Sequence, residues 1–292
     1  MKRIITGLAL ASAATLLAAG PAQAEPAAKD PVTAVTKQFV AGKGVKFSER
    51  TTAIEGNRRN IIIRQSGTYQ FSNAGVAASE TTGNFTIKAL ASGDDKPAKL
   101  DRIEKALITP ERTITIGKWT YLSGGLWEAL LPTGKTWFLV RKGPVSGLTS
   151  IYGQPLNLTE AATLKTLIKG AKAAEGGYAG KITVGDLLKV SPYFRGSFLG
   201  DMPNKKSAKV AISWKLTVDA EGLPARLVTT YPLTALYSEA SKHRAVSVET
   251  LYSGWGSTVE IAAPPIDQVT EEFKNGEDEI PSLEIPLSRI VH

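Results

Sequence analysis

The chain has 292 residues, 42% of them hydrophobic, and carries a formal net charge of +8. This size and apolar content allow one large domain or two small ones with a substantial core. The sequence has no cysteine, which excludes disulfides and anchoring through a lipidated cysteine, and only two histidines, which argues strongly against histidine-rich zinc sites and Ser-His-Asp catalysis.

The first residues have the pattern of an export signal. Lys2 and Arg3 precede an apolar run over residues 4–19, and Ala22-Gln23-Ala24 offers the small residues that signal peptidase requires. We expect a signal peptide over residues 1–24, a linker over residues 25–31, and a soluble protein exported to the extracellular or cell-envelope space. An uncleaved membrane anchor is the alternative, but the apolar run is short for a bilayer span.

The charge that remains after export is positive. Loss of Lys2 and Arg3 leaves the mature chain with a net charge of +6. This charge could favour peripheral contact with an anionic membrane or envelope surface, although a solvated basic surface is the simpler interpretation. The basic residues are dispersed along the sequence and do not form a run, so we expect no nucleic-acid partner.

The first half of the expected domain is rich in strand patterns. Asp30 and Pro31 suit a helix cap and a first helical residue, and we expect a short helix that ends at Gly42. Short turns between successive strands favour an antiparallel meander, because parallel pairing would need a crossover after each strand. Apolar alternation between turn residues predicts these strands over residues 45–54, 59–71, 76–89, 98–108 and 112–121.

Two amphipathic helices are expected in the middle of the chain. The first covers residues 159–174, with Thr159 as its cap and Glu160 in its first turn, and stops at Gly176-Gly177. The second covers residues 184–190, with Thr183 as its cap and Ser191-Pro192 at its end. Apolar residues form one face of the first helix and lysines the opposite face. The apolar face consists of Leu164, Leu167, Ile168 and Ala171, and the basic face of Lys165, Lys169 and Lys172.

The second β-rich half contains the strongest strand pattern. Residues 210–218 alternate apolar and more polar side chains, Asp219-Ala220-Glu221-Gly222 supplies a turn, and residues 223–231 and 246–252 follow as further strands. The two β-rich halves are compatible with one continuous sheet, so we expect a single domain over residues 32–275. Two Ile-Pro pairs predict an extended tail over residues 276–292.

The search for catalytic chemistry gives mostly negative results. His243 lies in a polar loop between predicted strands, and Ser146 lacks the frame of a nucleophile elbow. Phosphate-binding glycine motifs are absent. Asp94-Asp95 and Glu277-Asp278-Glu279 lack the alternating spacing of a calcium loop. We therefore expect no catalytic residues, no bound metal and no cofactor, and we do not expect an enzyme.

Several motifs in order along the chain resemble one protein family. They are Tyr121-Leu122-Ser123-Gly124-Gly125, Ser191-Pro192-Tyr193, Trp214-x-Leu216-x-Val218-Asp219, Gly222-Leu223-Pro224-x-Arg226, Tyr252-Ser253-x-Trp255-Gly256 and Ile261-x-x-Pro264-Pro265. Over residues 32–269 the chain resembles the LppX/LprA/LprF/LprG lipoproteins of actinobacteria. The resemblance implies a LolA-like fold, a curved antiparallel half-barrel with helices in its concave side, and lipid as ligand. The chain departs from that family because it lacks the lipidated cysteine.

The expected fold is therefore α+β, with a large curved antiparallel half-barrel sheet and helices packed in its concave side. The first hypothesis is a monomeric, non-catalytic carrier of a lipid or lipidated glycan in a dry internal cavity. The alternative is an RseB-like sensor or interaction module with a filled core; a cavity of several hundred Å³ would favour the carrier. The candidate cavity-lining residues are Ile61, Ile63, Phe71, Leu164, Leu167, Ile168, Ile212, Trp214 and Leu216.

Overall fold

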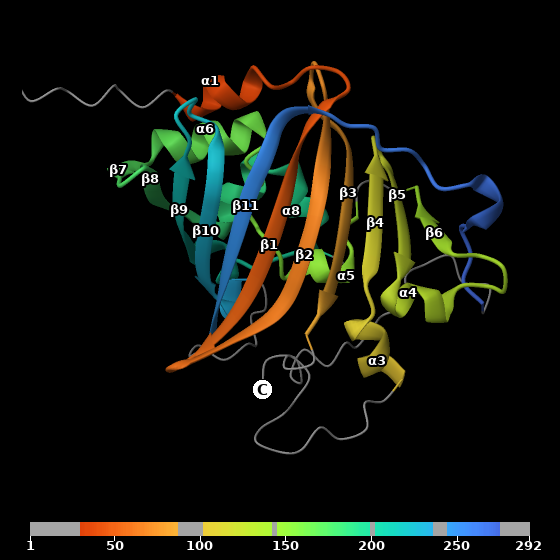
Figure 1. The fold of residues 1–292 in the computed structure, drawn as a ribbon. Coiled ribbons are helices and arrows are strands. Elements are labelled where there is room, and N and C mark those ends of the chain that lie inside the picture. Colours follow the sequence, from red (N-terminus) through yellow and green to blue (C-terminus); the bar gives the residue numbers. More distant parts are fainter. Residues whose placement is uncertain (1–29, 87–101, 142–144, 199–201, 236–243, 275–292) are drawn as a thin grey trace, which may run out of the picture.

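A single curved sheet dominates the protein. The computed structural model describes residues 30–86, 102–141, 145–198, 202–235 and 244–274. Twelve strands form the sheet, in the order β12-β6-β5-β4-β3-β2-β1-β11-β10-β9-β8-β7. Neighbouring strands are antiparallel except β12 and β6, which pair in parallel. The α-helices α5, α6 and α8 lie on one side of this sheet, inside its curve (Figure 1). This arrangement confirms the expected half-barrel architecture.

The first half of the chain is the predicted antiparallel meander with short helices inserted. Each strand pairs with the next along the chain from β1 to β6. The elements are α1 (Pro31–Thr36), β1 (Lys43–Glu55), β2 (Arg58–Ser72), β3 (Gly75–Phe85), α3 (Arg102–Ile108), β4 (Glu111–Ile116), β5 (Trp119–Gly124), α4 (Gly125–Leu130) and β6 (Trp137–Val140).

The second half of the chain carries the helical layer and the rest of the sheet. Its elements are α5 (Leu148–Ile151), α6 (Ala161–Lys169), β7 (Lys172–Ala174), β8 (Gly177–Thr183), α7 (Val184–Val190), α8 (Pro192–Gly196), β9 (Ala211–Val218), β10 (Pro224–Pro232), β11 (Arg244–Thr258) and β12 (Val269–Thr270). Short 3₁₀ turns cover Ser207–Lys209, Leu233–Ala235 and Ile266–Gln268.

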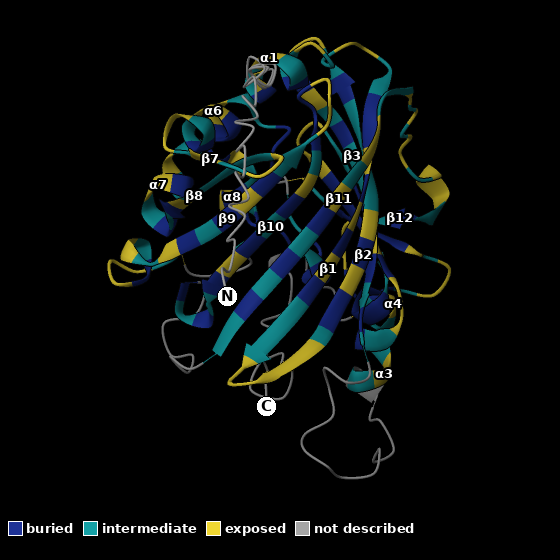
Figure 2. Cartoon of the chain, turned by 60° about the vertical axis from the view of Figure 1, so that its left-hand side comes forward, coloured by how far each residue is buried: buried dark blue, intermediate teal, exposed yellow. Residues whose placement is uncertain are grey.

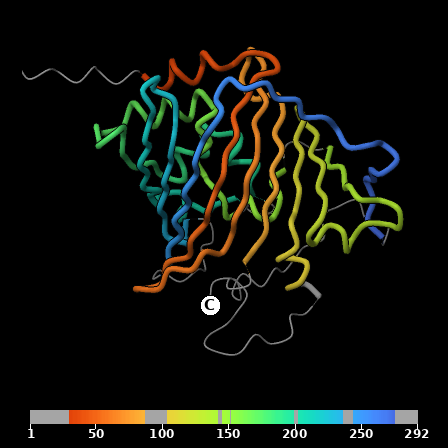
Figure 3. The backbone as a smooth tube through the Cα atoms, viewed as in Figure 1, coloured from red at the N-terminus to blue at the C-terminus, as the bar shows by residue number. Residues whose placement is uncertain are grey.

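The two β-rich halves join through the first and one of the last strands. β1 pairs with β11 over almost its whole length, from Lys43 opposite Thr258 to Glu55 opposite Arg244. In Figure 3 the late strand β11 lies directly beside β1 and separates it from β10. The expectation of one continuous sheet is therefore confirmed, although β11 runs six residues beyond the predicted end of that strand at Tyr252.

Four predicted elements, two strands and two helices, differ from the structure. The strand expected over residues 98–108 is wrong where the structure describes it, because residues 102–108 form α3, which packs against α4 through good helix formers such as Leu107. The strand expected over residues 112–121 is a hairpin, since Gly117 adopts a φ of 59° and reverses the chain between β4 and β5.

The helix expected over residues 159–174 is shorter than predicted. It starts at Ala161 and ends with Gly170 as its C-cap, and residues 172–174 form the edge strand β7, which pairs with β8. The first helix likewise ends at Thr36 and not at Gly42. Two of the three predicted caps are confirmed: Asp30 accepts hydrogen bonds from the amides of Val32 and Thr33, and Thr183 Oγ1 from the amide of Asp186 at 3.0 Å. The third is wrong, because Glu160 and not Thr159 holds the N-cap position of α6.

The main hydrophobic core fills the space between α6, α7 and the half of the sheet that they cover. Leu164 and Leu167 are buried there with Trp214, and Ile168 packs against the same cluster. Lys165 and the other two predicted surface lysines are exposed. The predicted inner face of the helix is thus confirmed. In Figure 2 the long strands alternate between buried and more exposed residues, as period-two patterning requires.

No helix among the described residues is both long and apolar enough to span a bilayer. The predicted signal peptide, His243 and the predicted tail lie outside the residues that the structure describes.

Candidate functional site

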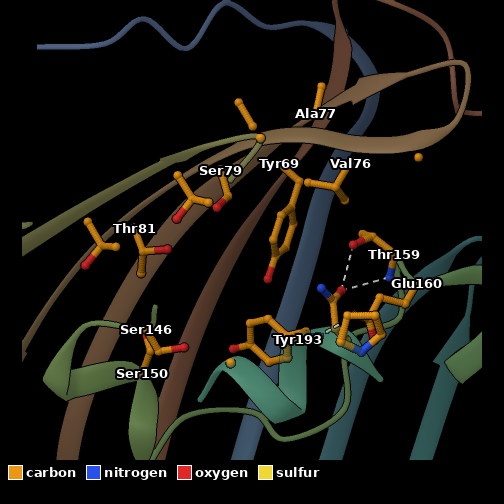
Figure 4. Close-up of a pocket in the computed structure, with 18 of the residues that line it drawn as sticks. Tyr69, Val76, Ala77, Ser79, Thr81, Ser146, Ser150, Thr159, Glu160 and Tyr193 are labelled. Atoms are coloured by element: carbon orange, nitrogen blue, oxygen red, sulfur yellow. Dashed lines mark hydrogen bonds between the residues drawn. The ribbon is translucent and has the colours of Figure 1, made fainter. Parts of the chain in front are cut away.

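A cavity of about 340 Å³ lies between the concave face of β1–β4 and the helical layer. Figure 4 shows Tyr69, Ser79 and Thr81 on the sheet, across the cavity from Ser146, Ser150 and Tyr193. The lining mixes aromatic and small apolar side chains with hydroxyl groups and one carboxylate. Its chemically distinctive members are Phe39, Phe47, Tyr69, Val76, Ser79, Thr81, Thr113, Thr115, Ser146, Ser150, Asn157, Thr159, Glu160 and Tyr193.

Strand register places the floor of the cavity on one face. Thr81 of β3 lies opposite Gly67 of β2 and Thr113 of β4, and Ser79 is flanked in the same way by Tyr69 and Thr115. Residues directly opposite each other in neighbouring strands project to the same side of a sheet. The hydroxyl side chains of three strands therefore form one continuous polar surface.

A glycine in β2 makes room for an aromatic ring on this floor. Gly67 lies opposite Phe47 of β1, and a Cβ atom at Gly67 would come within 2.6 Å of the Phe47 ring. The ring can therefore lie flat over the glycine, where it also stacks on Tyr69 with 5.1 Å between ring centroids. This pair gives the cavity its aromatic wall.

The roof of the cavity is held together by Glu160, the residue that precedes α6. One carboxylate oxygen accepts a hydrogen bond from the amide of Tyr193 at 2.7 Å. The other oxygen accepts from Ser191 Oγ at 2.5 Å and from Thr163 Oγ1 at 2.8 Å. Both oxygens are thus occupied by protein donors, and α8 is fixed to the start of α6.

A second carboxylate, Glu49, lies behind the aromatic wall and ties the segment before α6 to the sheet. Its oxygens accept from Gln65 Nε2 at 2.5 Å, from the amide of Gln154 at 2.9 Å and from Thr250 Oγ1 at 3.0 Å. Complete burial raises the pKa of Glu49 to about 7, although these hydrogen bonds oppose the shift. The group therefore titrates near neutrality.

A third carboxylate, Glu111 at the start of β4, anchors the N-terminus of α5. It accepts hydrogen bonds from Trp127 Nε1 at 2.6 Å, from the amides of Leu148 and Thr149 at 2.9 and 3.2 Å, and from Thr149 Oγ1 at 3.1 Å. Burial raises its pKa, against the effect of these donors. Glu49 and Glu111 fasten the helical layer to the sheet, and Glu160 joins α6 to α8 within that layer.

The three tyrosines near Glu49 are half-buried. Burial raises the pKa of Tyr69, Tyr193 and Tyr252, and the negative charge of Glu49 adds to the effect in each case. Their hydroxyl groups therefore stay protonated across the physiological pH range. A protonated phenol can both donate and accept a hydrogen bond, which suits it to a neutral polar partner.

The nine residues predicted to contact a ligand are not among those that line this cavity. Leu164, Leu167, Ile212, Trp214 and Leu216 come together, but in the filled core.

The remaining four lie elsewhere along the sheet and helices. Ile63 belongs to the same core cluster, and Ile168 packs against it. Phe71 is buried beside Phe39, and Ile61 is half-buried. Ligand contact by the nine residues stays a prediction, while the cavity is lined by others.

The sequence does contain a signal for the buried carboxylates. Val45, Phe47, Glu49 and Thr51 have one parity in β1, so an acid occupies an inward position among apolar neighbours. The hydroxyl residues of the floor give no such signal, because serine and threonine occur on both faces of the sheet. In the part of the chain that the structure describes, no three side chains of His, Cys, Asp or Glu gather closely enough to hold a metal ion.

Similarity to known proteins is found among solved structures and at low sequence identity. No family model matches the chain, and no curated protein is similar in sequence. The resemblance to the LppX/LprG family therefore stays a prediction.

Among solved structures, one similar protein is a LolA superfamily protein from Nitrosomonas europaea, with 7% identity and a TM-score of 0.32 over 77% of this chain and 91% of that chain. Another is a DUF1329 family protein from Desulfovibrio piger, with 10% identity and a TM-score of 0.32 over 80% and 95% of the two chains.

Proposed function

We propose that this protein is an exported, non-catalytic carrier that binds an amphiphilic ligand, a lipid or a lipidated glycan, between its sheet and its helices. The observation that carries the proposal is the cavity of about 340 Å³ on the concave face. Its volume lies at the lower end of the range of roughly 300–1,000 Å³ that is typical of small-molecule sites.

The lining suits a molecule with one apolar and one polar part. Phe47 and Val76 offer apolar surface, whereas Ser79 and Thr81 offer hydroxyl groups within the same cavity. The sequence predicts a dry apolar cavity, whereas hydroxyl groups form part of the lining here. An amphiphile would place its chain against the first group and its head against the second.

An entrance to the cavity lies at the end of the sheet where β3 begins. Val76 lines the cavity and is still 40% exposed, so part of the lining reaches the surface. Gly117 of the β4–β5 hairpin borders the cavity at the same end, where its amide bonds to the carbonyl of Ala77. A ligand could enter here without unfolding the sheet.

Export is part of the proposal. It rests on Lys2, Arg3 and the apolar run that follows, together with the small residues at Ala22 and Ala24. A carrier in the cell envelope would shield the apolar part of its ligand from water, which is the role that a cavity of this kind can fill.

The test is a pair of substitutions at adjacent positions of β3. Thr81 points into the cavity, and Thr82 is exposed on the opposite face. Thr81→Phe should fill ligand space and lower binding of the neutral fluorescent probe N-phenyl-1-naphthylamine by at least tenfold, whereas Thr82→Phe should leave binding unchanged. Equal binding by the two variants, or no binding by the unsubstituted protein, would refute the proposal.

The second candidate is a sensor or interaction module that carries no ligand. The observation in its favour is the filled core around Ile212, Trp214 and Leu216, which leaves no dry chamber at the face where the sequence predicted one. A protein that fails to take up the probe would favour this candidate.

A further inference from the structure

Most of the free polar groups that line the cavity are hydroxyls, and Asn157 Nδ2 adds an amide donor. Tyr69, Ser79, Thr81 and Tyr193 all line the cavity, and the side-chain hydroxyl of none of them has a hydrogen bond to another described residue. A hydroxyl group is both a donor and an acceptor, so it matches a partner that has the same dual character. The alcohol groups of a sugar or a glycerol are partners of this kind.

The carboxylates beside the cavity are not free in this way. Both oxygens of Glu160 already accept from Thr163, Ser191 and the Tyr193 amide. Both oxygens of Glu49 are occupied likewise. A cationic head group would therefore have to displace internal hydrogen bonds in order to pair with either acid, which removes most of the gain.

Acidic and basic side chains at neighbouring positions of β1 and β4 point to opposite faces of the sheet. Glu49 and Glu111 point to the concave face, while their neighbours Arg50 and Arg112 are exposed on the convex face and pair there with Glu249 and Glu80. Among the described residues that line the cavity, none is a lysine, an arginine or a histidine. A phosphate or carboxylate in the cavity would lose its hydration close to buried carboxylates with no cation to compensate, which is costly.

From these observations we infer that the cavity selects the uncharged, hydroxyl-rich head group of an amphiphile, such as a glycosyl or glyceryl group, against anionic and cationic heads. The head group would lie among Ser79, Thr81, Tyr69 and Tyr193, with the ring faces of the tyrosines covering its less polar surfaces. This inference rests on the proposed function and adds the chemical class of the ligand.

The experiment compares three amphiphiles that share one chain and differ in the head. Octyl-β-D-glucoside, octyl phosphate and octyltrimethylammonium are titrated calorimetrically into the protein, each below its micellar concentration. We expect the glucoside to bind at least tenfold more tightly than either charged compound. Charged compounds that bind as tightly as the glucoside would overturn the inference.

Two isosteric substitutions locate the effect. Thr81→Val removes one cavity hydroxyl and should weaken glucoside binding by about fivefold, as expected for one hydrogen bond; it should weaken N-phenyl-1-naphthylamine binding by less than this. Thr82→Val, on the exposed face, is the matched control. Ser79→Ala provides a second cavity variant if Thr81→Val is unstable.

The outcomes separate the inference from the proposed function. If the naphthylamine probe binds but the three octyl compounds bind equally or not at all, the carrier stands and the head-group inference fails. If neither the probe nor any octyl compound binds, the proposed function itself fails.

Discussion

The buried carboxyl group of Glu49 makes a definite prediction about stability and pH. Its pKa is 4.5 in an unfolded chain and about 7 in the folded protein, because burial penalises the charged form. Since each pKa unit corresponds to about 1.4 kcal/mol, this difference amounts to about 3 kcal/mol. The folded pKa is raised, so the contribution is fully present below pH 4.5 and is lost as the pH rises through 7.

Glu49→Gln removes this titration, keeps the size of the side chain and, like the protonated carboxyl group, offers one acceptor oxygen and a donor. The free energy of unfolding, measured by urea titration between pH 4.5 and 8, should fall by about 3 kcal/mol more in the unsubstituted protein than in the variant. Glu111 also has a raised pKa, but it is present in both proteins and cancels in the difference.

Glu249→Gln is the matched control on the other face of the sheet. Burial alone raises the pKa of Glu249, but the hydrogen bonds and charges of Arg226 and Arg50 outweigh it and leave the pKa lowered. Its contribution is therefore lost only below pH 4.5, outside the window. Parallel pH profiles for Glu49→Gln and the unsubstituted protein would refute the reasoning, because they would mean that Glu49 does not titrate in this range.

Three further substitutions test the packing. Glu111→Ala should lower the free energy of unfolding by about 3 kcal/mol or more in urea, because it leaves Trp127 Nε1 and two amides without their acceptor; a loss below 1 kcal/mol would contradict this. Leu164→Ala should lower the free energy of unfolding by about 2–5 kcal/mol, while Lys165→Ala on the exposed face should change it by no more than about 0.5 kcal/mol. Equal losses would contradict the inward orientation of Leu164. Leu216→Trp should overpack the core and lower the free energy of unfolding by about 1–3 kcal/mol, without changing N-phenyl-1-naphthylamine binding. Reduced binding at unchanged stability would instead put Leu216 beside the ligand.

Much of the sheet could be predicted from local sequence because its patterns are redundant. Between Ala211 and Val218 the inward residues are large and apolar and the outward ones are small or polar, and Gly222, with a φ of 82°, makes the turn that follows. The caps at Asp30 and Thr183 are equally local, since one side chain and the following amides determine them.

The predicted secondary structure was wrong where the local pattern and the tertiary packing disagree. Ile103 and Ile108 suit a strand, yet residues 102–108 form a helix that packs against α4. Lys172 continues the spacing of the basic helix face, but Gly170 ends the helix, and the next residues complete the edge of the sheet. Propensity is a weak prior that such contacts override.

The position of the cavity could not be predicted from pattern alone. Apolar alternation is strongest at Ile212, Trp214 and Leu216, and helices α6 and α7 fill the space above them. The cavity lies instead over β1–β4, where Ser79 and Thr81 face the helical layer. A filled and an unfilled stretch of sheet differ in what packs over them, and that depends on long-range contacts that no short window of sequence contains.

The most direct test of the central claim is to map where a ligand lies. An alkyl glucoside that carries a photoreactive diazirine on its glucosyl head group is bound and irradiated, and the crosslinked peptides are identified by mass spectrometry. The account predicts crosslinks in the β3 segment that contains Ser79 and Thr81 and in the α8 segment that contains Tyr193, and their loss on competition with unlabelled octyl glucoside. Crosslinks confined to Ala211–Val218, or to the convex face of the sheet, would contradict it.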